Sequence, residues 1–182
     1  KGKYAKTPVL HHEVIEVDGK KIGYLVYTSF DQEYNQDMLD AIMELKAAGV
    51  EEFILDLRCN SGGAVTSAVR LCSALMPQRY EGQTLCSLVR NPNNTISNQI
   101  TDYKLEKTGE ILSLESLTGI CSDYTASASE LLVMGLRGLD VPVTLVGSQT
   151  EGKNCGMDVT RKTIDGEIPV TGSSLIVFPW VS

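Results

Sequence analysis

The order of predicted elements constrains the fold more than any other feature of this chain. Residues 21–28 are rich in β-forming side chains, and residues 53–57 form an apolar run that is typical of a buried strand. Between them, apolar residues at positions 38–45 recur every three or four residues, which predicts a helix that ends at Gly49. A strand, a helix and a strand of these lengths predict a right-handed crossover between parallel strands.

The same order returns further along the chain. A second amphipathic helix is predicted over residues 65–76, where it ends before Pro77. A third is predicted over residues 127–139, between short strands at residues 117–121 and 141–146. We therefore expect an α/β protein with a mostly parallel sheet and covering helices.

Two stretches depart from this order. The middle of the chain is less regular: residues 85–89 are a candidate strand, residues 91–94 predict a turn, and residues 111–117 are ambiguous. Near the end, a turn at Asp165 and Gly166 and a strand over residues 174–178 predict a hairpin.

Composition predicts a single domain. The 182 residues, 42% of them apolar, suffice for one sizeable core, and no repeat or linker divides them. The formal charge is −7, and the 16 basic residues are scattered among 23 acidic ones, which argues against nucleic acid as a partner. No apolar run approaches the roughly 18 residues that span a bilayer, and residues 1–7 lack the apolar core of a signal peptide. Because the chain starts without Met, we expect it to be a piece of a longer protein.

The five cysteines do not form a metal-binding pattern. Cys59, Cys72, Cys86, Cys121 and Cys155 show no Cys-x-x-Cys spacing, and the two histidines are adjacent and far in sequence from most of them. We expect no metal site, and free thiols are favoured over disulfides. Cys72 lies on the apolar face of a predicted helix, where a buried small hydrophobe is expected.

A serine and a lysine give the strongest chemical signal. Ser127 opens the third predicted helix, and Lys153 lies in a glycine-containing loop after the next strand, 153 − 127 = 26 residues later. A serine becomes a nucleophile when an adjacent base removes its proton, and a lysine shielded from water can be that base. The helix dipole favours an anion at this position, with the N–H of Ala128 directed at the reacting carbonyl. The pair predicts a serine hydrolase.

A glycine pair is a candidate oxyanion hole. Gly62 and Gly63 follow a predicted strand and directly precede a helix, so that the backbone can turn tightly and bring N–H groups close to a substrate. The loops that carry Gly62, Ser127 and Lys153 each follow a strand of the expected sheet. Ligands gather at the carboxyl ends of such strands.

Each of these residues also has a purely structural interpretation. Strand-to-helix turns often need glycine without any catalytic role. Ser127 and Glu130 have the spacing of a helix capping box, and we assign Ser129 and Glu130 to capping and packing. Lysine in a loop is usually solvated, so burial of Lys153 beside the serine would decide between the interpretations.

Together these segments resemble the C-terminal processing, or tail-specific, serine peptidases. The similarity extends from about Lys20 to Gly156, with four motifs in the family's order. They are Gly23-Tyr-Leu-Val-Tyr-Thr-Ser-Phe30, Phe53-Ile-Leu-Asp-Leu-Arg-Cys-Asn-Ser-Gly-Gly63, Ser127-Ala-Ser-Glu130 and Gly147-Ser-Gln-Thr-Glu-Gly-Lys153. The resemblance implies Ser127 as the nucleophile and Lys153 as the general base. It also implies an oxyanion hole made by the N–H of Gly62 or Gly63 and the N–H of Ala128.

The resemblance further implies a crotonase-like fold, no cofactor and a peptide or protein substrate. It implies an extracytoplasmic or periplasmic location, with anchoring to a membrane through an N-terminal segment outside this sequence. Two features depart from the family. Many members carry a glutamine four residues after the lysine, where this chain has Met157. Members also commonly carry a PDZ domain that captures the substrate tail, and nothing in these 182 residues resembles one.

The expected function is a serine endopeptidase that hydrolyses peptide bonds of extended or C-terminal protein segments through an acyl-enzyme. We expect the substrate to lie extended beside a strand edge. Two alternatives stay open. A peptide-binding module of the same fold would keep Ser127 as a cap and Lys153 as a surface residue, which the departure at Met157 favours. A crotonase-like acyl-thioester enzyme would use the same glycine loop but needs a basic cluster for nucleotide phosphates, and none is evident.

Overall fold

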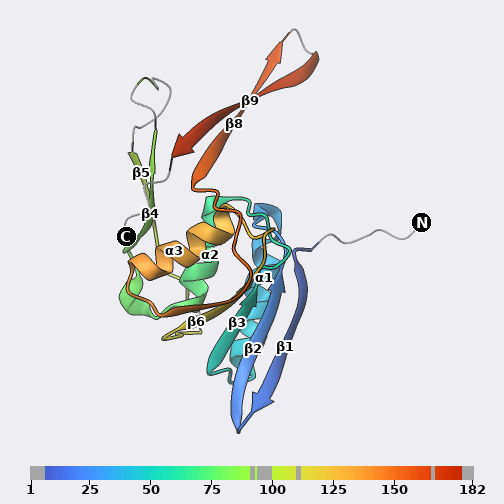
Figure 1. Cartoon of the computed structure of the whole chain (residues 1–182), viewed down its shortest axis with the longest axis vertical. Helices are drawn as coiled ribbons and strands as arrows, with labels where there is room; N and C mark the ends of the chain where they lie inside the picture. Colours follow the sequence, from blue (N-terminus) through green and yellow to red (C-terminus); the bar gives the residue numbers. More distant parts are fainter. Residues whose placement is uncertain (1–6, 91–92, 94–99, 110–111, 165–166, 178–182) are drawn as a thin grey trace, which may run out of the picture.

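Two β-sheets and three α-helices make up the part of the chain that the computed structural model describes, residues 7–90, 93, 100–109, 112–164 and 167–177 (Figure 1). The larger sheet has five strands in the order β1-β2-β3-β6-β7, and the smaller has four in the order β5-β4-β9-β8.

The larger sheet is mostly parallel, as the sequence predicts. Its four parallel strands are β2 (Lys20–Tyr27), β3 (Glu52–Asp56), β6 (Leu117–Cys121) and β7 (Val143–Gly147). The edge strand β1 (Val9–Val17) pairs antiparallel with β2 through a tight turn at Asp18 and Gly19. The α/β class is thereby confirmed.

Three helices connect these strands and bury their apolar sides against the sheet. They are α1 (Asn35–Ala47), α2 (Val65–Leu75) and α3 (Ala128–Gly138). Each lies within a few residues of its predicted bounds. Helix α2 ends just before Pro77, which has no N–H to continue a helical hydrogen-bond pattern.

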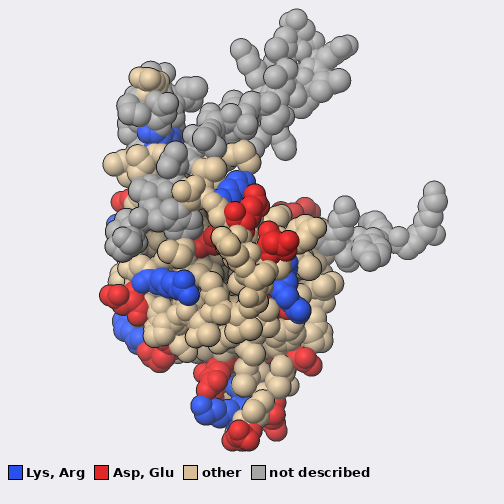
Figure 2. Space-filling model, viewed as in Figure 1, with Lys and Arg blue, Asp and Glu red and all other residues tan. Residues whose placement is uncertain are grey.

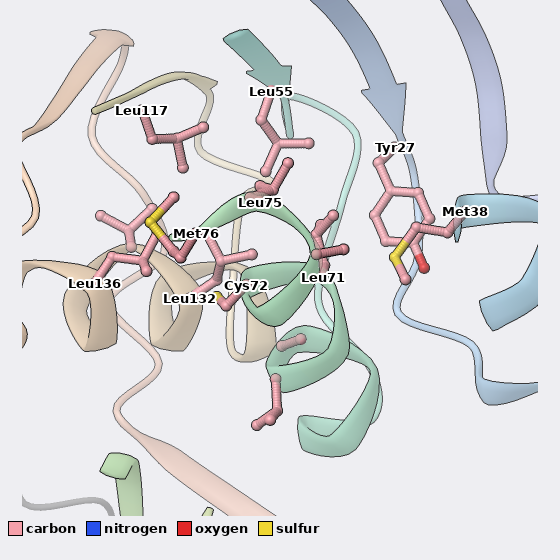
Figure 3. Close-up of a cluster of buried hydrophobic side chains, with 14 of the residues drawn as sticks. Tyr27, Met38, Leu55, Leu71, Cys72, Leu75, Met76, Leu117, Leu132 and Leu136 are labelled. Atoms are coloured by element: carbon pink, nitrogen blue, oxygen red, sulfur yellow. The ribbon is translucent and has the colours of Figure 1, made fainter. Parts of the chain in front are cut away.

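The core lies between the helices and one face of the larger sheet. In Figure 3, α2 lies beside α3, and Cys72 points toward Leu132 while Leu55 and Leu117 reach in from the strands. Cys72 is fully buried, as predicted, and this burial raises the pKa of its thiol. Successive side chains of a strand point to opposite faces of the sheet, so only every second one enters this core. Leu55 is 0% exposed, whereas its neighbour Ile54 on the opposite face is half-buried.

The smaller sheet contains the predicted C-terminal hairpin. Its strands are β4 (Thr84–Val89), β5 (Ile100–Lys104), β8 (Cys155–Ile164) and β9 (Glu167–Val177). Strand β4 is the candidate strand of the irregular middle segment, and β8 and β9 pair antiparallel and extend away from the helices (Figure 1). The predicted turn at Asp165 and Gly166, most of the turn at 91–94, and Phe178 lie outside the described residues.

Two strands were not predicted from the sequence. Strand β1 mixes polar residues such as His11, His12 and Glu13 with apolar ones and is half to fully exposed, so the alternation that reveals a half-buried strand is weak. Strand β5 is an edge strand of the smaller sheet, and it lies in the segment with the least regular pattern. Both segments adopt the strand conformation because they pair with a neighbouring strand, and their own composition does not predict it.

Charged side chains of both signs are interspersed over the face of the molecule in Figure 2. Within the described residues, no helix is long and apolar enough to cross a membrane. All five cysteines are free thiols in the structure.

Candidate active site

Four loops meet at the carboxyl edge of the parallel strands. They follow β2, β3, β6 and β7 and comprise residues 28–34, 57–64, 122–127 and 148–154. Hydrogen bonds connect them. The N–H of Ala126 donates to the Asn60 carbonyl at 3.2 Å, and the N–H of Glu151 donates to the Thr125 carbonyl at 3.0 Å. The three loops singled out in the sequence are therefore neighbours in space.

These loops enclose a cavity of about 400 Å³. Ser127, Ala128, Lys153 and Gly63 all line it. The structure thus brings together four of the five residues predicted for the site, and the fifth, Gly62, lies directly behind Ser127. The remaining wall includes apolar side chains from the smaller sheet and from helices α2 and α3, among them Val65, Leu88, Tyr103 and Leu131.

Ser127 adopts a rare backbone conformation. Its φ is +54° and its ψ is −114°, immediately before the first residue of α3. A non-glycine residue with positive φ is uncommon, and strain of this kind concentrates at functional sites. The next residue, Ala128, stands at the first helical position, where the N–H has no intrahelical acceptor. Ser127 is half-buried, so its side chain is still open to the cavity.

The glycine pair packs tightly against the serine. Gly62 has φ +105°, and a Cβ there would lie 2.8 Å from Ser127 Cβ and 2.9 Å from the Ala128 nitrogen. Gly63 has φ +143°, and a Cβ there would overlap the Phe30 carbonyl. Both positions therefore require glycine for conformation and for space. The two N–H groups differ: that of Gly62 donates to Asn60 Oδ1 at 2.9 Å, whereas that of Gly63 makes no hydrogen bond within the described residues.

Lys153 is half-buried at the cavity. Among the described residues its ammonium group has no hydrogen-bond or ion-pair partner, whereas its backbone N–H donates to Glu130 Oε2 at 2.9 Å. Met157, at the position where the family resemblance implies a glutamine, lines the same cavity and is 54% exposed. The segment that carries the lysine is thus positioned through its backbone.

Glu130 connects the serine to the lysine loop. Its buried carboxylate accepts four hydrogen bonds, from the N–H groups of Ser127, Gly152 and Lys153 and from the Thr150 hydroxyl, at 2.6–2.9 Å. The predicted capping contact to Ser127 is one of the four. The other three link residues 20 to 23 positions away, and no local sequence signal indicates them.

Ser129, which we assigned to capping and packing, is fully buried and donates its hydroxyl to the Asn60 carbonyl at 3.0 Å. Its side chain therefore packs the serine segment against the glycine loop.

An ion pair anchors the start of the glycine loop. Asp56, at the end of β3, is 2% exposed and accepts bonds from the Tyr24 hydroxyl at 2.7 Å and from Arg58 Nη2 at 2.6 Å. Burial by itself would raise the pKa of Asp56, but the hydrogen bonds from Arg58 and Tyr24 outweigh it and hold that pKa below its usual value. No motif in the sequence indicates this pair.

Metal ligands do not gather in the part of the chain described: no group of three or more His, Cys, Asp and Glu side chains there is placed to hold an ion.

Comparison with known proteins agrees with this geometry. The profile of peptidase family S41 matches residues 21–175, which is most of the chain. The chain belongs to peptidase family S41. The resemblance to C-terminal processing serine peptidases, drawn from the four sequence motifs, is confirmed at the level of the family.

Named relatives of this S41 chain come from bacteria. A carboxyl-terminal-processing protease of Synechocystis is 28% identical over 135 residues, which cover 74% of this chain and 29% of that protein. A probable CtpA-like serine protease of Staphylococcus aureus is 24% identical over 164 residues, which cover 90% of this chain and 31% of that protein. This chain therefore spans about a third of the length of the relatives it matches.

Solved structures of S41 proteins share the fold. A Bacteroides fragilis protein assigned to the S41 proteases superposes with a TM-score of 0.80 at 28% identity, over 93% of this chain and 46% of that one. The photosystem II D1 C-terminal processing protease superposes with a TM-score of 0.67 at 24% identity, over 97% of this chain and 43% of that one. The second likeness concerns the fold alone.

Proposed function

We propose that this S41 chain is the catalytic core of a serine endopeptidase in which Ser127 is the nucleophile and Lys153 the general base. One observation carries the proposal: four residues suited to this chemistry line one cavity. They are the strained Ser127 at the start of α3, Lys153, which has no ion-pair partner among the described residues, and Gly63 and Ala128. Family membership and relatives named as carboxyl-terminal-processing proteases support it.

The proposed reaction is acyl transfer to serine and then to water. Neutral Lys153 takes the proton from Ser127 Oγ while that oxygen attacks the carbonyl carbon of the scissile peptide bond. The N–H groups of Gly63 and Ala128 stabilise the negative charge that develops on the carbonyl oxygen. The tetrahedral intermediate collapses, the amine leaves with the proton from the lysine, and an ester to Ser127 remains. Lys153 then takes a proton from water while the water oxygen attacks the ester carbonyl. It returns this proton to Ser127 Oγ as the C–O bond breaks, which releases the acid product and restores the serine hydroxyl.

The proposed substrate is an extended or C-terminal segment of a protein. Strand β8 begins beside the lysine, and Gly156 and Met157 at its start line the cavity next to Ser127. A peptide that lies along a strand presents each carbonyl in a fixed direction without requiring a particular sequence. The extracytoplasmic location implied by the resemblance stays a prediction.

Covalent labelling tests this proposal. Intact-mass spectrometry of the full-length protein, treated with a fluorophosphonate or a peptidyl boronate, should show one adduct. Ser127→Ala and Lys153→Ala should each lose it, because the first lacks the nucleophile and the second lacks the base. Ser116→Ala and Lys107→Ala, which change exposed residues away from the cavity, are the matched controls and should label at the parent rate.

The outcomes distinguish a peptidase from a peptide-binding module. An adduct that is lost only in the Ser127 and Lys153 variants supports the peptidase. If the parent forms no adduct but still binds unlabelled peptides, the pair is inert and the chain is a peptide-binding module. If Lys153→Ala labels as fast as the parent, another group is the base.

A further inference from the structure

Asn60 is a buried polar residue that the reaction proposed above does not use. It is 0% exposed, and its side chain forms two hydrogen bonds. Nδ2 donates to the Tyr27 carbonyl at 3.0 Å, and Oδ1 accepts the N–H of Gly62 at 2.9 Å. An amide can donate and accept at the same time without carrying charge, which suits it to a bridge inside the protein.

The main-chain carbonyl of Asn60 binds the segment that carries Ser127. Its carbonyl accepts the N–H of Ala126 at 3.2 Å and the hydroxyl of Ser129 at 3.0 Å. These two residues flank Ser127 in the sequence. One buried residue therefore connects the end of β2, the glycine loop and the segment that carries the serine.

The Asn60 side chain also decides which glycine N–H can face a substrate. Because Asn60 occupies the N–H of Gly62, that group is not available to a ligand. The carbonyl of Gly62 accepts the N–H of Phe30 at 3.0 Å, on one side of the peptide unit. The peptide unit is planar and trans, so the N–H of Gly63 points to the opposite side. Gly63 is also one of the residues that line the cavity, together with Ala128.

We propose that Asn60 is the positioning residue of the oxyanion hole. By binding the N–H of Gly62, it leaves the N–H of Gly63 as the donor of this loop and holds it next to the N–H of Ala128. The catalytic consequence rests on the proposed peptidase function, whereas the orientation of the two N–H groups does not.

Kinetics test the catalytic part. Asn60→Ala releases the N–H of Gly62, which belongs to the Ser61–Gly62 peptide unit, and removes the side-chain bond to β2. The N–H of Phe30 still binds the Gly62 carbonyl, but the glycine loop loses two of the bonds that place it and can shift relative to Ala128. We expect kcat to fall about 10²- to 10³-fold, the loss seen when one oxyanion donor is removed, with KM within about threefold of the parent value. The affinity for a peptidyl boronate, which forms a tetrahedral adduct, should fall in parallel with kcat, whereas the affinity for the cleaved peptide should not.

A second buried variant controls for lost stability. Ser73→Ala removes a buried hydroxyl that donates to the Val69 carbonyl at 2.7 Å and accepts the N–H of Glu106 at 2.8 Å, away from the cavity. It should lower the melting temperature and keep kcat. A kcat for Asn60→Ala within about threefold of the parent, or an equal loss in Ser73→Ala, would overturn the proposal.

Amide hydrogen exchange tests the orientation independently of activity. In protein labelled with ¹⁵N-glycine, the amide of Gly62 should exchange slowly and that of Gly63 fast, and Asn60→Ala should remove the protection of Gly62. If the parent shows this pattern but forms no serine adduct, the peptidase function fails while the role of Asn60 in orientation stands. If Gly63 is as protected as Gly62 in the parent, the proposal is wrong, and this holds even if the alanine variant does not fold.

Discussion

The carboxylate of Glu130 accepts the backbone N–H of Lys153 at 2.9 Å, and the same oxygen accepts the N–H of Ser127 at 2.8 Å. The two residues proposed to exchange a proton are thus held to one buried group. A carboxylate has enough lone pairs to accept several donors at once, and buried donors without acceptors are costly. Glu130 therefore positions the lysine segment in a chain that has Met157 where the family resemblance implies a glutamine.

Glu130→Ala is expected to reduce kcat more than 100-fold and to destabilise the protein by at least about 2 kcal/mol, because several buried donors lose their acceptor. Glu130→Gln keeps an acceptor oxygen but turns an NH₂ group toward N–H donors, so it should lie between the alanine variant and the parent. The measurements are peptide hydrolysis and urea unfolding. Glu115→Ala, which breaks an exposed ion pair with Arg79, is the control and should have little effect on stability because solvent screens this pair. Normal hydrolysis by Glu130→Ala would contradict the positioning role.

Gly62→Ala is expected to reduce the rate of peptide hydrolysis at least about 100-fold. The new Cβ would lie 2.8 Å from Ser127 Cβ, so either the serine or the glycine loop must shift. Gly82→Ala is the matched control, because Gly82 also has a positive φ, +77°, but a Cβ there meets nothing within 4 Å. It should cost about 1–2 kcal/mol of stability from backbone strain and leave kcat unchanged. Equal activities in the two variants would contradict the tight packing.

Removal of Arg58 is expected to change how stability depends on pH. The pKa of Asp56 is lowered in the folded state, so its ionisation stabilises the fold above the unfolded-state pKa of about 3.9, and this contribution is lost as the pH falls through the lower folded-state pKa. Arg58→Met removes the largest of the interactions that lower this pKa, while the hydrogen bond from Tyr24 stays, so the pKa of Asp56 should rise from its value in the parent. The loss of stability relative to the parent should therefore be largest near pH 7 and shrink toward pH 3.5.

Urea midpoints at pH 7, 5 and 3.5 check this prediction. Arg79→Met is the control, because Arg79 pairs with the exposed Glu115, where solvent screens the interaction. A difference between Arg58→Met and the parent that stays constant over this pH range would mean that Asp56 ionisation is not linked to folding.

Alkylation should separate the cysteines by burial. Cys59 is exposed, whereas burial raises the pKa of Cys86 to about 12 and also raises that of Cys72. Only the thiolate reacts, so at pH 8 iodoacetamide should modify Cys59 first and leave Cys72 and Cys86 intact until the protein unfolds. Peptide mapping by mass spectrometry measures this order. Modification of all five cysteines in denaturant is the positive control, and native Cys72 reacting as fast as Cys59 would refute the buried core position.

Periodicity and turn signals were enough to predict most of the elements of this fold. Helices α1, α2 and α3 carry apolar residues at three- and four-residue spacing, and strands β2, β3 and β6 are short β-forming runs, so each element has a pattern of its own. Edge strands β1 and β5 have no such pattern, since only their neighbours in the sheet stabilise them. The assembly of β4, β5, β8 and β9 into one sheet likewise depends on pairing between distant segments.

For the candidate site, too, the sequence predicts some features and only the folded structure reveals the others. The sequence by itself determined the candidate residues Ser127, Lys153, Gly62, Gly63 and Ala128, because each stands in a short motif whose residue types suit the chemistry. Only the tertiary structure decided that Glu130 binds the lysine segment and that Asn60 occupies the N–H of Gly62, whereas the N–H of Gly63 has no hydrogen-bond partner among the described residues. The physical reason is that a buried hydrogen bond depends on which atoms the folded chain brings together. Glu130 and Lys153 are 23 positions apart, and no sequence pattern predicts a hydrogen bond between residues so far apart.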